Sequence, residues 1–311
     1  MNYRECAKLL LAQDDLLLLT HKNPDGDTMC SAAALCSALR RMGKRAWLFP
    51  NPDVILKQRP FVEPYYAPAD FVPAYRVSVD VATEGLFSAG YEGTIDLCID
   101  HHPTNSHYAG EELIRDEKSS CGEIILELIK VLCGDVTKEE ATLLYIAVTT
   151  DTGCFQYANT SWHTLASASE LLRLGADSLM VSHTFFRKVS LARLKLEGLI
   201  YSNMSFHHDD KVVIAMVTLD MMKKAGATED DCDDLAGLSG RAETCVMNVT
   251  IREKENGSSK ISVRSNPGIS SSRVCAAFGG GGHDMAAGCT IPEPPEKAKE
   301  LLLAVIDEVM R

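Results

Sequence analysis

Short apolar runs separated by longer amphipathic segments dominate the first part of the chain. Residues 7–20 read as a short helix that runs into a strand, and residues 27–42 as a helix that ends at Gly43. Four runs have the length and composition of buried strands, and they lie at residues 16–19, 45–49, 76–80 and 94–100. Strands that alternate with helices predict an α/β fold with a doubly wound, mostly parallel sheet.

Further helical patterns follow the last of these runs. Residues 119–132 are predicted as a helix, with Ser119 or Ser120 as its cap and Glu123 in capping-box position. Thr137 caps the next helix. The remaining segments of this part are connecting structure at 50–73, with room for a short helix, and two more helices at 161–174 and 177–186.

The pattern changes after residue 200. Strand-like runs now lie far apart in the chain, at 212–217, 244–252 and 260–264, and helices are predicted near 219–224, 230–239 and 296–309. This is the pattern of a smaller α+β domain. We therefore expect three parts: a first domain at 1–186, an amphipathic helical linker at 187–200 and a C-terminal domain at 201–311.

Composition narrows the class of protein. The chain has 311 residues, of which 46% are hydrophobic and 24% charged, and its net charge of -12 argues against a groove that wraps long double-stranded nucleic acid. No apolar run approaches the length of a membrane span, and no signal peptide is evident. Eleven cysteines without paired spacing fit reduced thiols, so we expect a cytoplasmic protein that does not bind membranes.

Candidate chemistry begins directly after the first strand, at residues 21–27. His21, Asp25 and Asp27 surround Pro24 and Gly26 in a tight loop at the carboxyl end of a strand, where open α/β sheets place their ligands. Carboxylate and imidazole groups suit manganese or magnesium. A purely structural interpretation stays open at this point, with Asp27 as a helix cap, Asp25 closing an Asx turn and His21 ending the strand.

Later strand and helix ends supply more groups of the same kind. Four carboxylates that converge without cations would repel one another, so such a site demands bound metal. Six side chains suit two metals that share one bridging carboxylate, and Asp80, alone at its strand end, is our choice for the bridge. The six expected ligands are His21, Asp25, Asp27, Asp80, His101 and Asp151.

Two histidines follow the fourth strand directly. Because adjacent residues at a strand end face opposite ways, we assign His101 as a ligand and His102 as a hydrogen-bond donor to phosphate or a general acid, with the exchange of these roles left open. Asp100, a carboxylate next to the imidazole expected to bind metal, is a candidate partner that fixes the neighbouring geometry.

These motifs resemble, in order, those of the DHH phosphoesterase superfamily. Residues 263–266 and 278–288 resemble the C-terminal substrate domain that accompanies one branch of it, and the chain is most similar to the nanoRNase and pAp phosphatase group. Cys30 departs from the first motif, which usually has glycine there, and we expect this change to be tolerated. The resemblance implies a metal-binding catalytic domain, a substrate-binding C-terminal domain and a homodimer as one oligomeric state.

The resemblance also implies an activity. It implies an enzyme with two Mn²⁺ ions per site, or Mg²⁺ or Co²⁺ in their place, that hydrolyses short RNA oligonucleotides, dinucleotides and adenosine bisphosphate (pAp). In the C-terminal domain, Arg264 could clamp a terminal phosphate, although a surface arginine is an equally simple interpretation. A glycine run by itself favours a flexible turn, but the adjoining His283 and the alanine-rich, helix-like segment after it favour a cradle of glycine amides for an anion. The expected substrate-binding residues are Arg264, Ser265, Gly280, Gly281, Gly282 and His283.

Two other functions remain open from the sequence. The same metals could serve an inorganic pyrophosphatase or a phosphodiesterase for linear dinucleotides, and only the substrate would differ. A catalytically inactive relative could instead bind a nucleotide, although such a module would be expected to have a broken ligand set, and here all six positions are filled.

Overall fold

The computed structural model describes residues 1–232 and 235–310, which form two compact units, Met1–Lys188 and Val189–Arg311. We describe each unit by itself. The segment expected to link two domains forms helix α8 (Leu191–Ser202), and this helix belongs to the second unit. Among the described helices, none is long and apolar enough to cross a membrane.

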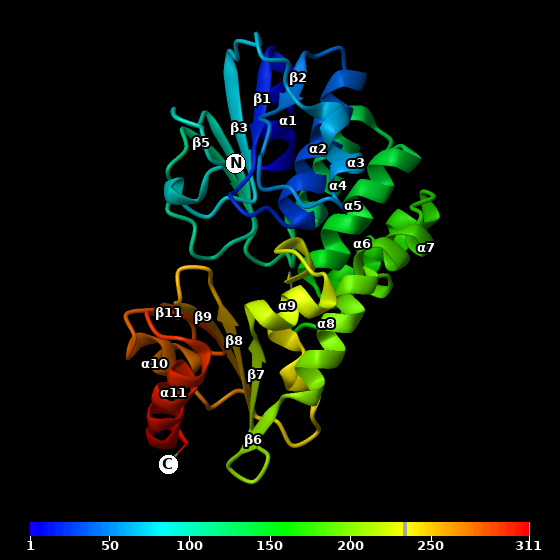
Figure 1. The fold of residues 1–311 in the computed structure, drawn as a ribbon. Coiled ribbons are helices and arrows are strands. Elements are labelled where there is room, and N and C mark those ends of the chain that lie inside the picture. Colours follow the sequence, from blue (N-terminus) through cyan, green and yellow to red (C-terminus); the bar gives the residue numbers. More distant parts are fainter. Residues whose placement is uncertain (233–234, 311) are drawn as a thin grey trace. The chain divides into compact units, whose positions relative to one another are not determined.

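The first unit is built on a parallel sheet, as predicted (Figure 1). Its strands are β1 (Leu16–Leu19), β2 (Ala46–Leu48), β3 (Tyr75–Val79), β4 (Leu97–Asp100) and β5 (Glu111–Ile114), in the spatial order β2-β1-β3-β4-β5. The edge strand β5 was not predicted, because its sequence, Glu-Glu-Leu-Ile, lacks an apolar run. In the structure only one of its four positions is fully buried. The parallel order places the carboxyl ends of β1, β3 and β4 side by side.

Both faces of this sheet are covered. Leu16 and Leu18 join the core that the helices form on one face. On the other face, the Tyr108 hydroxyl lies 2.8 Å from the Ser78 hydroxyl of β3. The helices of this unit are α1 (Tyr3–Ala12), α2 (Gly26–Arg41), α3 (Arg59–Val62), α4 (Cys121–Cys133), α5 (Lys138–Asp151), α6 (Trp162–Arg173) and α7 (Ser178–Val181), which runs on into a π-helical turn at Ser182–Arg187.

The helix cap predicted for α5 is confirmed, and the capping box predicted for α4 is not. Thr137 and Glu140 form the full capping box at the start of α5. At α4 the N-cap is Ser120, but its side chain makes no capping bond. Glu123 instead accepts hydrogen bonds from the backbone N–H and the hydroxyl of Ser119. The capping box expected there is therefore wrong, because the buried Glu123 carboxylate faces the residue before the cap.

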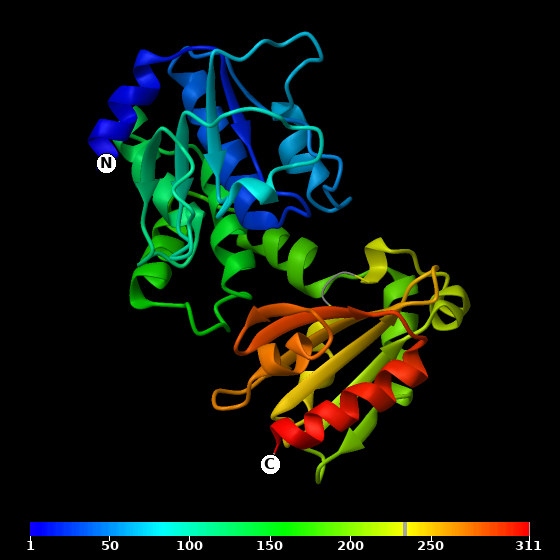
Figure 2. The same ribbon diagram turned by 90° about the vertical axis from the view of Figure 1, so that its left-hand side faces the viewer.

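The second unit holds a six-stranded sheet in the order β10-β11-β9-β8-β7-β6, antiparallel except between β7 and β8. The strands are β6 (Ser205–His207), β7 (Val212–Val217), β8 (Met247–Glu253), β9 (Ser259–Ser265), β10 (Gly281–His283) and β11 (Ala286–Ile291). The helices are α8, α9 (Leu219–Ala225), α10 (Ser271–Ala276) and α11 (Pro295–Val309). Figure 2 shows α11 lying along this sheet, and Leu302 and Ile306 bury its inner face.

Two expectations for this unit need correction. The alanine-rich segment after His283, which we read as helix-like, is strand β11, because alternate residues from 286 to 291 are buried against α10 and α11. The helix expected at 230–239 is replaced by short 3-10 turns, Asp230–Cys232, Leu235–Gly237 and Ser239–Arg241. Residues 233 and 234 of that prediction lie outside the described residues.

Candidate active site

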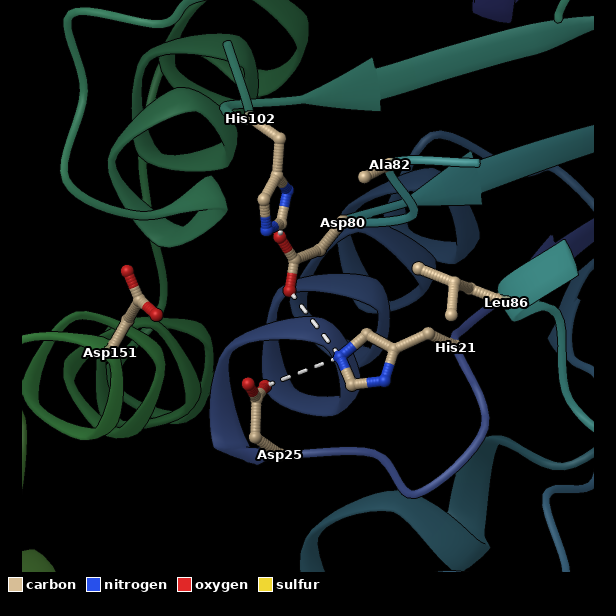
Figure 3. A pocket seen from close by; sticks show the side chains of 7 residues that line it. All are labelled: His21, Asp25, Asp80, Ala82, Leu86, His102 and Asp151. Atoms are coloured by element: carbon tan, nitrogen blue, oxygen red, sulfur yellow. Dashed lines mark ion pairs between the residues drawn. The ribbon is translucent and has the colours of Figure 1, made fainter. Parts of the chain in front are cut away.

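The six predicted ligands lie in one cluster at the carboxyl edge of the first unit's sheet. Asp80 and His101 directly follow β3 and β4, and His21 is the second residue after β1. Helix α2 supplies its N-cap, Asp25, and Asp27 from its first turn, and α5 supplies its last residue, Asp151. Five side chains of the site surround a pocket of about 230 Å³ (Figure 3). They are His21, Asp25, Asp80, His102 and Asp151, with Ala82 and Leu86 completing the wall.

Asp80 lies at the centre of the cluster. One of its carboxylate oxygens, Oδ2, is 3.8 Å from His21 Nε2, and the other, Oδ1, is 3.3 Å from His101 Nε2. The residue is only 3% exposed, and its backbone has a φ of 62°, a left-handed conformation that is uncommon outside functional sites. Within the described part of the chain, Oδ1 has no hydrogen-bond partner. A buried carboxylate oxygen without a donor is costly and fits a bridging metal ligand.

Both ligand histidines direct the same ring nitrogen into the site. His21 Nδ1 lies 2.9 Å from the carbonyl oxygen of Lys22, and His101 Nδ1 lies 3.3 Å from that of Lys118. A carbonyl oxygen accepts a hydrogen bond, so Nδ1 of each ring carries a proton, and in the neutral imidazole the lone pair of Nε2 is the one left to bind a metal. Metal-binding histidines in proteins are commonly held in this way.

Asp27 is fixed by the amino end of α4, an interaction that we did not predict. Its Oδ2 accepts the backbone N–H of Cys121 at 2.7 Å, and its Oδ1 accepts that of Gly122 at 2.9 Å. Ser31 adds a hydroxyl donor at 3.0 Å. The sequence does predict a helix that starts near residue 120, but no local pattern indicates that its free amides face a carboxylate 94 residues earlier.

Asp25 makes the cap that the structural interpretation had given to Asp27. It is the N-cap of α2, and its Oδ1 accepts the backbone N–H of Asp27 at 2.9 Å and that of Thr28 at 3.1 Å. The same Oδ1 lies 3.8 Å from His21 Nε2. One oxygen of Asp25 therefore caps the helix, and the second oxygen faces no backbone donor among the hydrogen bonds of the described residues.

The charged groups of the cluster shift the pKa values of one another. Burial raises the pKa of Asp151 to about 7; the nearby His101 opposes this rise and Asp80 adds to it. Burial, with the carboxylates of Asp80 and Asp151, also raises the pKa of Asp27 well above its usual range. Burial opposes the charged form of His101, but the adjacent Asp80 carboxylate and the other surrounding carboxylates raise its pKa to about 10. A carboxylate cluster that holds protons so strongly is one that divalent cations neutralise.

The two adjacent histidines do not diverge, and our argument from strand alternation is wrong here. The rings of His101 and His102 lie with centroids 4.5 Å apart, and His102 Nδ1 is 3.5 Å from Asp80 Oδ1. The reason is that β4 ends at Asp100 and the chain turns, with the backbone N–H of both histidines directed at the Asp100 carboxylate. His102 therefore also faces the cluster.

Asp100 holds His102 in place. The fully buried carboxylate accepts His102 Nδ1–H at 2.8 Å through Oδ1 and the Asn105 side-chain amide at 2.6 Å through Oδ2. The hydrogen bond that His102 donates to Asp100 raises the pKa of His102, against the effect of burial. Asn105 was not predicted. A second amide that we missed, Asn159, contacts the Asp151 carboxylate at 3.4 Å and the carbonyl of Ser119 at 3.3 Å.

Four of the six predicted substrate-binding residues meet in the second unit. Arg264 on β9 and the glycines at 280–282 line one groove of about 840 Å³. The glycines are not a loose turn, because Gly281 and Gly282 pair with β11 and a Cβ at Gly280 would come within 2.4 Å of the Gly288 carbonyl oxygen. This packing excludes the flexible turn, but the Gly280 N–H donates to the Cys275 carbonyl at 3.0 Å, so that amide is not a free donor for an anion, contrary to the prediction.

The other two predicted residues lie beside this groove. His283 is exposed at the end of β10 and is not among the residues that line the groove. Ser265 directs its hydroxyl at the carbonyl of Ile269 and at the Ser271 hydroxyl, 2.8 Å away, so it fixes the start of α10. Cys30 is the residue that departs from the first motif. It is fully buried in the core of the first unit.

A parallel sheet whose carboxyl edge carries clustered aspartates and histidines defines a metal-dependent phosphoesterase. Residues 15–148 match the DHH family, N-terminal domain, and residues 209–311 match the DHHA1 domain. The chain belongs to the DHH family. One relative from Thermus thermophilus, named bifunctional oligoribonuclease and PAP phosphatase NrnA, is 33% identical, and the alignment covers 99% of this chain and 94% of the relative. A relative of the same name from Bacillus subtilis is 26% identical, with 92% of each chain covered.

Solved structures agree on the fold. An exopolyphosphatase-related protein from Bacteroides fragilis superposes with a TM-score of 0.88 at 22% identity, covering 98% of this chain and 96% of that one. Exonuclease RecJ bound to manganese superposes with a TM-score of 0.55 at 15% identity, covering 99% of this chain and 93% of that one. At these identities the likeness bears on the fold alone.

Proposed function

We propose that this protein hydrolyses short RNA oligonucleotides and pAp with two Mn²⁺ ions bound to His21, Asp25, Asp27, Asp80, His101 and Asp151. The observation that carries the proposal is the convergence of these side chains on Asp80, whose buried Oδ1 lacks a hydrogen-bond donor within the described residues. The relatives from Thermus thermophilus and Bacillus subtilis, whose names include both activities, support the choice of substrates.

In this proposal the metals supply a hydroxide from water near neutral pH and neutralise phosphate oxygens. The side chains of the protein itself orient the reacting groups and supply a proton. Asp100 keeps Nδ1 of His102 protonated, so that His102 can donate a hydrogen bond to a non-bridging oxygen or a proton to the leaving group. Asp27 and Asp25 are held by amides of α4 and α2, so they need not reorganise during turnover.

The second unit would recognise the part of the substrate away from the scissile bond. Arg264 offers a planar pair of donors for a phosphate, and Gly281 and Gly282 line the same groove without a side chain that would block it. We assign catalysis to residues 1–186 and substrate binding to residues 201–311, with 187–200 as the link. Cytoplasmic location and a homodimer remain predictions from the sequence.

A substrate panel tests the proposal. The purified protein is assayed for release of phosphate or mononucleotide from pAp, a three-nucleotide RNA, a linear diadenylate and pyrophosphate, each with Mn²⁺, Mg²⁺, Co²⁺ or chelator. We expect pAp and the short RNA to be the best substrates and Mn²⁺ the best metal. Pyrophosphate as the one good substrate would replace the proposal with a pyrophosphatase, and diadenylate as the one good substrate with a dinucleotide phosphodiesterase. Nucleotide binding without any turnover would indicate an inactive module.

A further inference from the structure

Glu123 is a buried carboxylate that the proposed hydrolysis does not use. It belongs to the first turn of α4, is 1% exposed and is not among the residues that line the pocket of the metal cluster. Its oxygens accept the backbone N–H of Ser119 at 3.2 Å and the Ser119 hydroxyl at 2.5 Å. From α6, the hydroxyls of Thr164 and Ser167 donate to it at 3.1 Å and 3.4 Å. The ammonium group of Lys118, 3.7 Å away, supplies the opposite charge, so the carboxylate fixes the chain before α4 against α6.

The segment that Glu123 fixes, residues 118–122, holds two of the expected ligands directly through its backbone. The carbonyl of Lys118 lies 3.3 Å from Nδ1 of His101 and orients that ring. The two amides at the start of α4 donate to the two oxygens of Asp27, at 2.7 Å and 2.9 Å. A shift of this backbone would therefore move His101 and Asp27 together.

A third ligand is reached through one side-chain amide. The carbonyl of Ser119 accepts Nδ2–H of Asn159 at 3.3 Å. The same amide nitrogen lies 3.4 Å from Asp151 Oδ2 and 3.2 Å from the Asp151 carbonyl oxygen. The position of Asp151 therefore depends on the same short segment as the positions of the other two ligands.

The ligands that depend on segment 118–122 form one of two groups in the cluster. Each residue of a group offers one ligand atom, and within a group these atoms lie within 4.8 Å of one another. The first group consists of Asp27, His101 and Asp151, and the second of His21, Asp25 and Asp80. Among the hydrogen bonds of the described residues, none joins segment 118–122 to the second group. That group has supports of its own, because Asp25 caps α2 and the side-chain amide of Asn51 donates to the His21 carbonyl at 2.9 Å.

We propose that Glu123 is a positioning residue for one of the two metals, the ion held by the first group. This inference rests on the proposed function, which supplies the two-metal site. Loss of the carboxylate would leave the N–H of Ser119 and the ammonium group of Lys118 without their buried acceptor. Segment 118–122 would then relax away from the three ligands that it aims, and the second group would keep its geometry.

Calorimetric titration of the apo protein with Mn²⁺ tests the proposal without relying on turnover. In Glu123→Ala, we expect one of the two sites to bind Mn²⁺ about 10–100-fold more weakly and the other to keep its wild-type affinity. In Glu123→Gln, the side-chain oxygen still accepts hydrogen bonds from Ser119 and the amide can donate to the hydroxyls of α6. Only the ion pair with Lys118 is lost, so affinity should return to within about fivefold of the wild type. Two sites of wild-type affinity in Glu123→Ala would overturn the proposal.

Ligand variants identify the weakened site. His21→Gln breaks the second group, so adding Glu123→Ala should weaken the site that remains. His101→Gln breaks the first group, so adding Glu123→Ala should leave the remaining site unchanged. Equal effects of Glu123→Ala in the two backgrounds would overturn the assignment to one ion.

Glu140→Ala separates positioning from a general loss of stability. Glu140 is likewise buried, and it accepts hydrogen bonds from Ser37 and Arg41 at 3.0 Å each. It lies in the first turn of α5, at the other end of that helix from Asp151. We expect the Tm to fall in both Glu140→Ala and Glu123→Ala, but the affinity for Mn²⁺ to fall only in Glu123→Ala. An equal loss of Mn²⁺ affinity in Glu140→Ala would make stability the cause and overturn the proposal.

If Glu123→Ala fails to fold, Ser119→Ala keeps the test decisive. This variant removes the hydroxyl that donates to Glu123, so the same site should bind Mn²⁺ about fivefold more weakly, as loss of one hydrogen bond predicts. Unchanged affinity in Ser119→Ala would then count against the positioning role. Wild-type protein that binds no Mn²⁺ would contradict the proposed function itself, whereas two sites that survive these substitutions at full affinity would overturn the positioning role alone.

Discussion

Gly26, in the first turn of α2, lies against Thr150, in the last turn of α5, with no space for a side chain between them. A Cβ at position 26 would come within 2.5 Å of the Thr150 Oγ1 and 2.7 Å of its Cγ2. The residues that flank this contact are Asp25 and Asp27 on one helix and Asp151 on the other. The absence of a side chain at position 26 therefore lets two helix ends bring three carboxylates to one place.

Gly26→Ala should lower both stability and activity. The added methyl group must push α2 and α5 apart, and overpacking of this kind costs about 1–3 kcal/mol of unfolding free energy. Chemical denaturation measures the loss, and a phosphoesterase assay measures the displacement of the carboxylates. We expect Thr150→Ala, combined with Gly26→Ala, to recover part of both, because the two nearest atoms are then removed.

The control for this substitution is Gly198→Ala in α8, where a Cβ would meet no atom within 4 Å. In an open helical position, alanine should leave stability unchanged or raise it by up to about 1 kcal/mol. Equal losses from Gly26→Ala with and without Thr150→Ala would show that the contact between α2 and α5 is not the cause.

Asp80→Asn should remove one of the two metals. The amide keeps the shape of the side chain but cannot bridge two cations as a carboxylate does, and the loss of several kcal/mol of charge stabilisation corresponds to a fall in kcat of about a thousandfold or more. Calorimetric titration of the apo protein with Mn²⁺ should show two sites for the wild type and one or none for the variant. The exposed Asp70→Asn serves as the control, and two intact sites in Asp80→Asn would contradict the bridging role.

The fold of the first unit was accessible from sequence because its strands are apolar runs bounded by turn residues. The same pattern predicted that the candidate ligands lie together, since a parallel sheet brings the residues that follow β1, β3 and β4 to one edge whatever their separation in the chain. Strand β5 was missed because an edge strand with two glutamates lacks the apolar signal.

The residues that contact the carboxylates of the site through the tertiary fold could not be predicted from the sequence pattern. Asn105 and Asn159 are single amides in loops, and nothing in the local sequence marks them as partners of Asp100 and Asp151. The prediction that His101 and His102 face opposite ways failed for a related reason, because strand alternation applies only up to the residue where the strand ends. In the second unit, β11 was mistaken for a helix because alanine-rich sequence carries weak periodicity.

Asp100→Asn should shift the pH profile of turnover. The hydrogen bond that His102 donates to the Asp100 carboxylate raises the pKa of His102, so protonated His102 persists to higher pH in the wild-type protein. Its removal lowers that pKa, and the alkaline limb of the kcat profile should move to lower pH, with kcat reduced by about 10–100-fold at the optimum. Asp96→Asn, outside the cluster, is the control. An unchanged alkaline limb would indicate that His102 does not act as an acid.

Arg264→Lys should separate binding from catalysis. A lysine keeps the charge but loses the paired donors, and loss of a charged hydrogen bond of about 1.5–3 kcal/mol corresponds to a rise in the KM for pAp of about 10–100-fold. The kcat should change little, because the ligand cluster lies in the other unit. Ser265→Ala is the matched neighbour: its hydroxyl contacts Ile269 and Ser271, so thermal stability should fall while KM is nearly unchanged. The reverse pattern would move phosphate recognition from Arg264 to Ser265.

Metal binding should stabilise the protein more at neutral than at acid pH. Without metal, burial raises the pKa of Asp151 from 3.8 to about 7, so the folded protein binds a proton that the unfolded chain releases in this interval. The stability contributed by this proton is present at low pH and is lost as the pH rises towards about 7. Mn²⁺ needs the ionised carboxylate, so the gain in Tm on adding Mn²⁺ to the apo protein should increase across the same interval.

The matched variant for this prediction is Asp151→Asn, which has no proton to lose at that position. Its apo form should show a weaker fall in Tm between pH of about 4 and about 7 than the wild type, because the amide stays neutral throughout. Its gain in Tm on adding Mn²⁺ should also be smaller, since one ligand oxygen has lost its charge. Scanning fluorimetry in parallel buffers measures all four profiles. A metal-induced gain that is independent of pH in the wild type would mean that Asp151 is already ionised in the apo protein, and that cations are not what relieves the repulsion in this cluster.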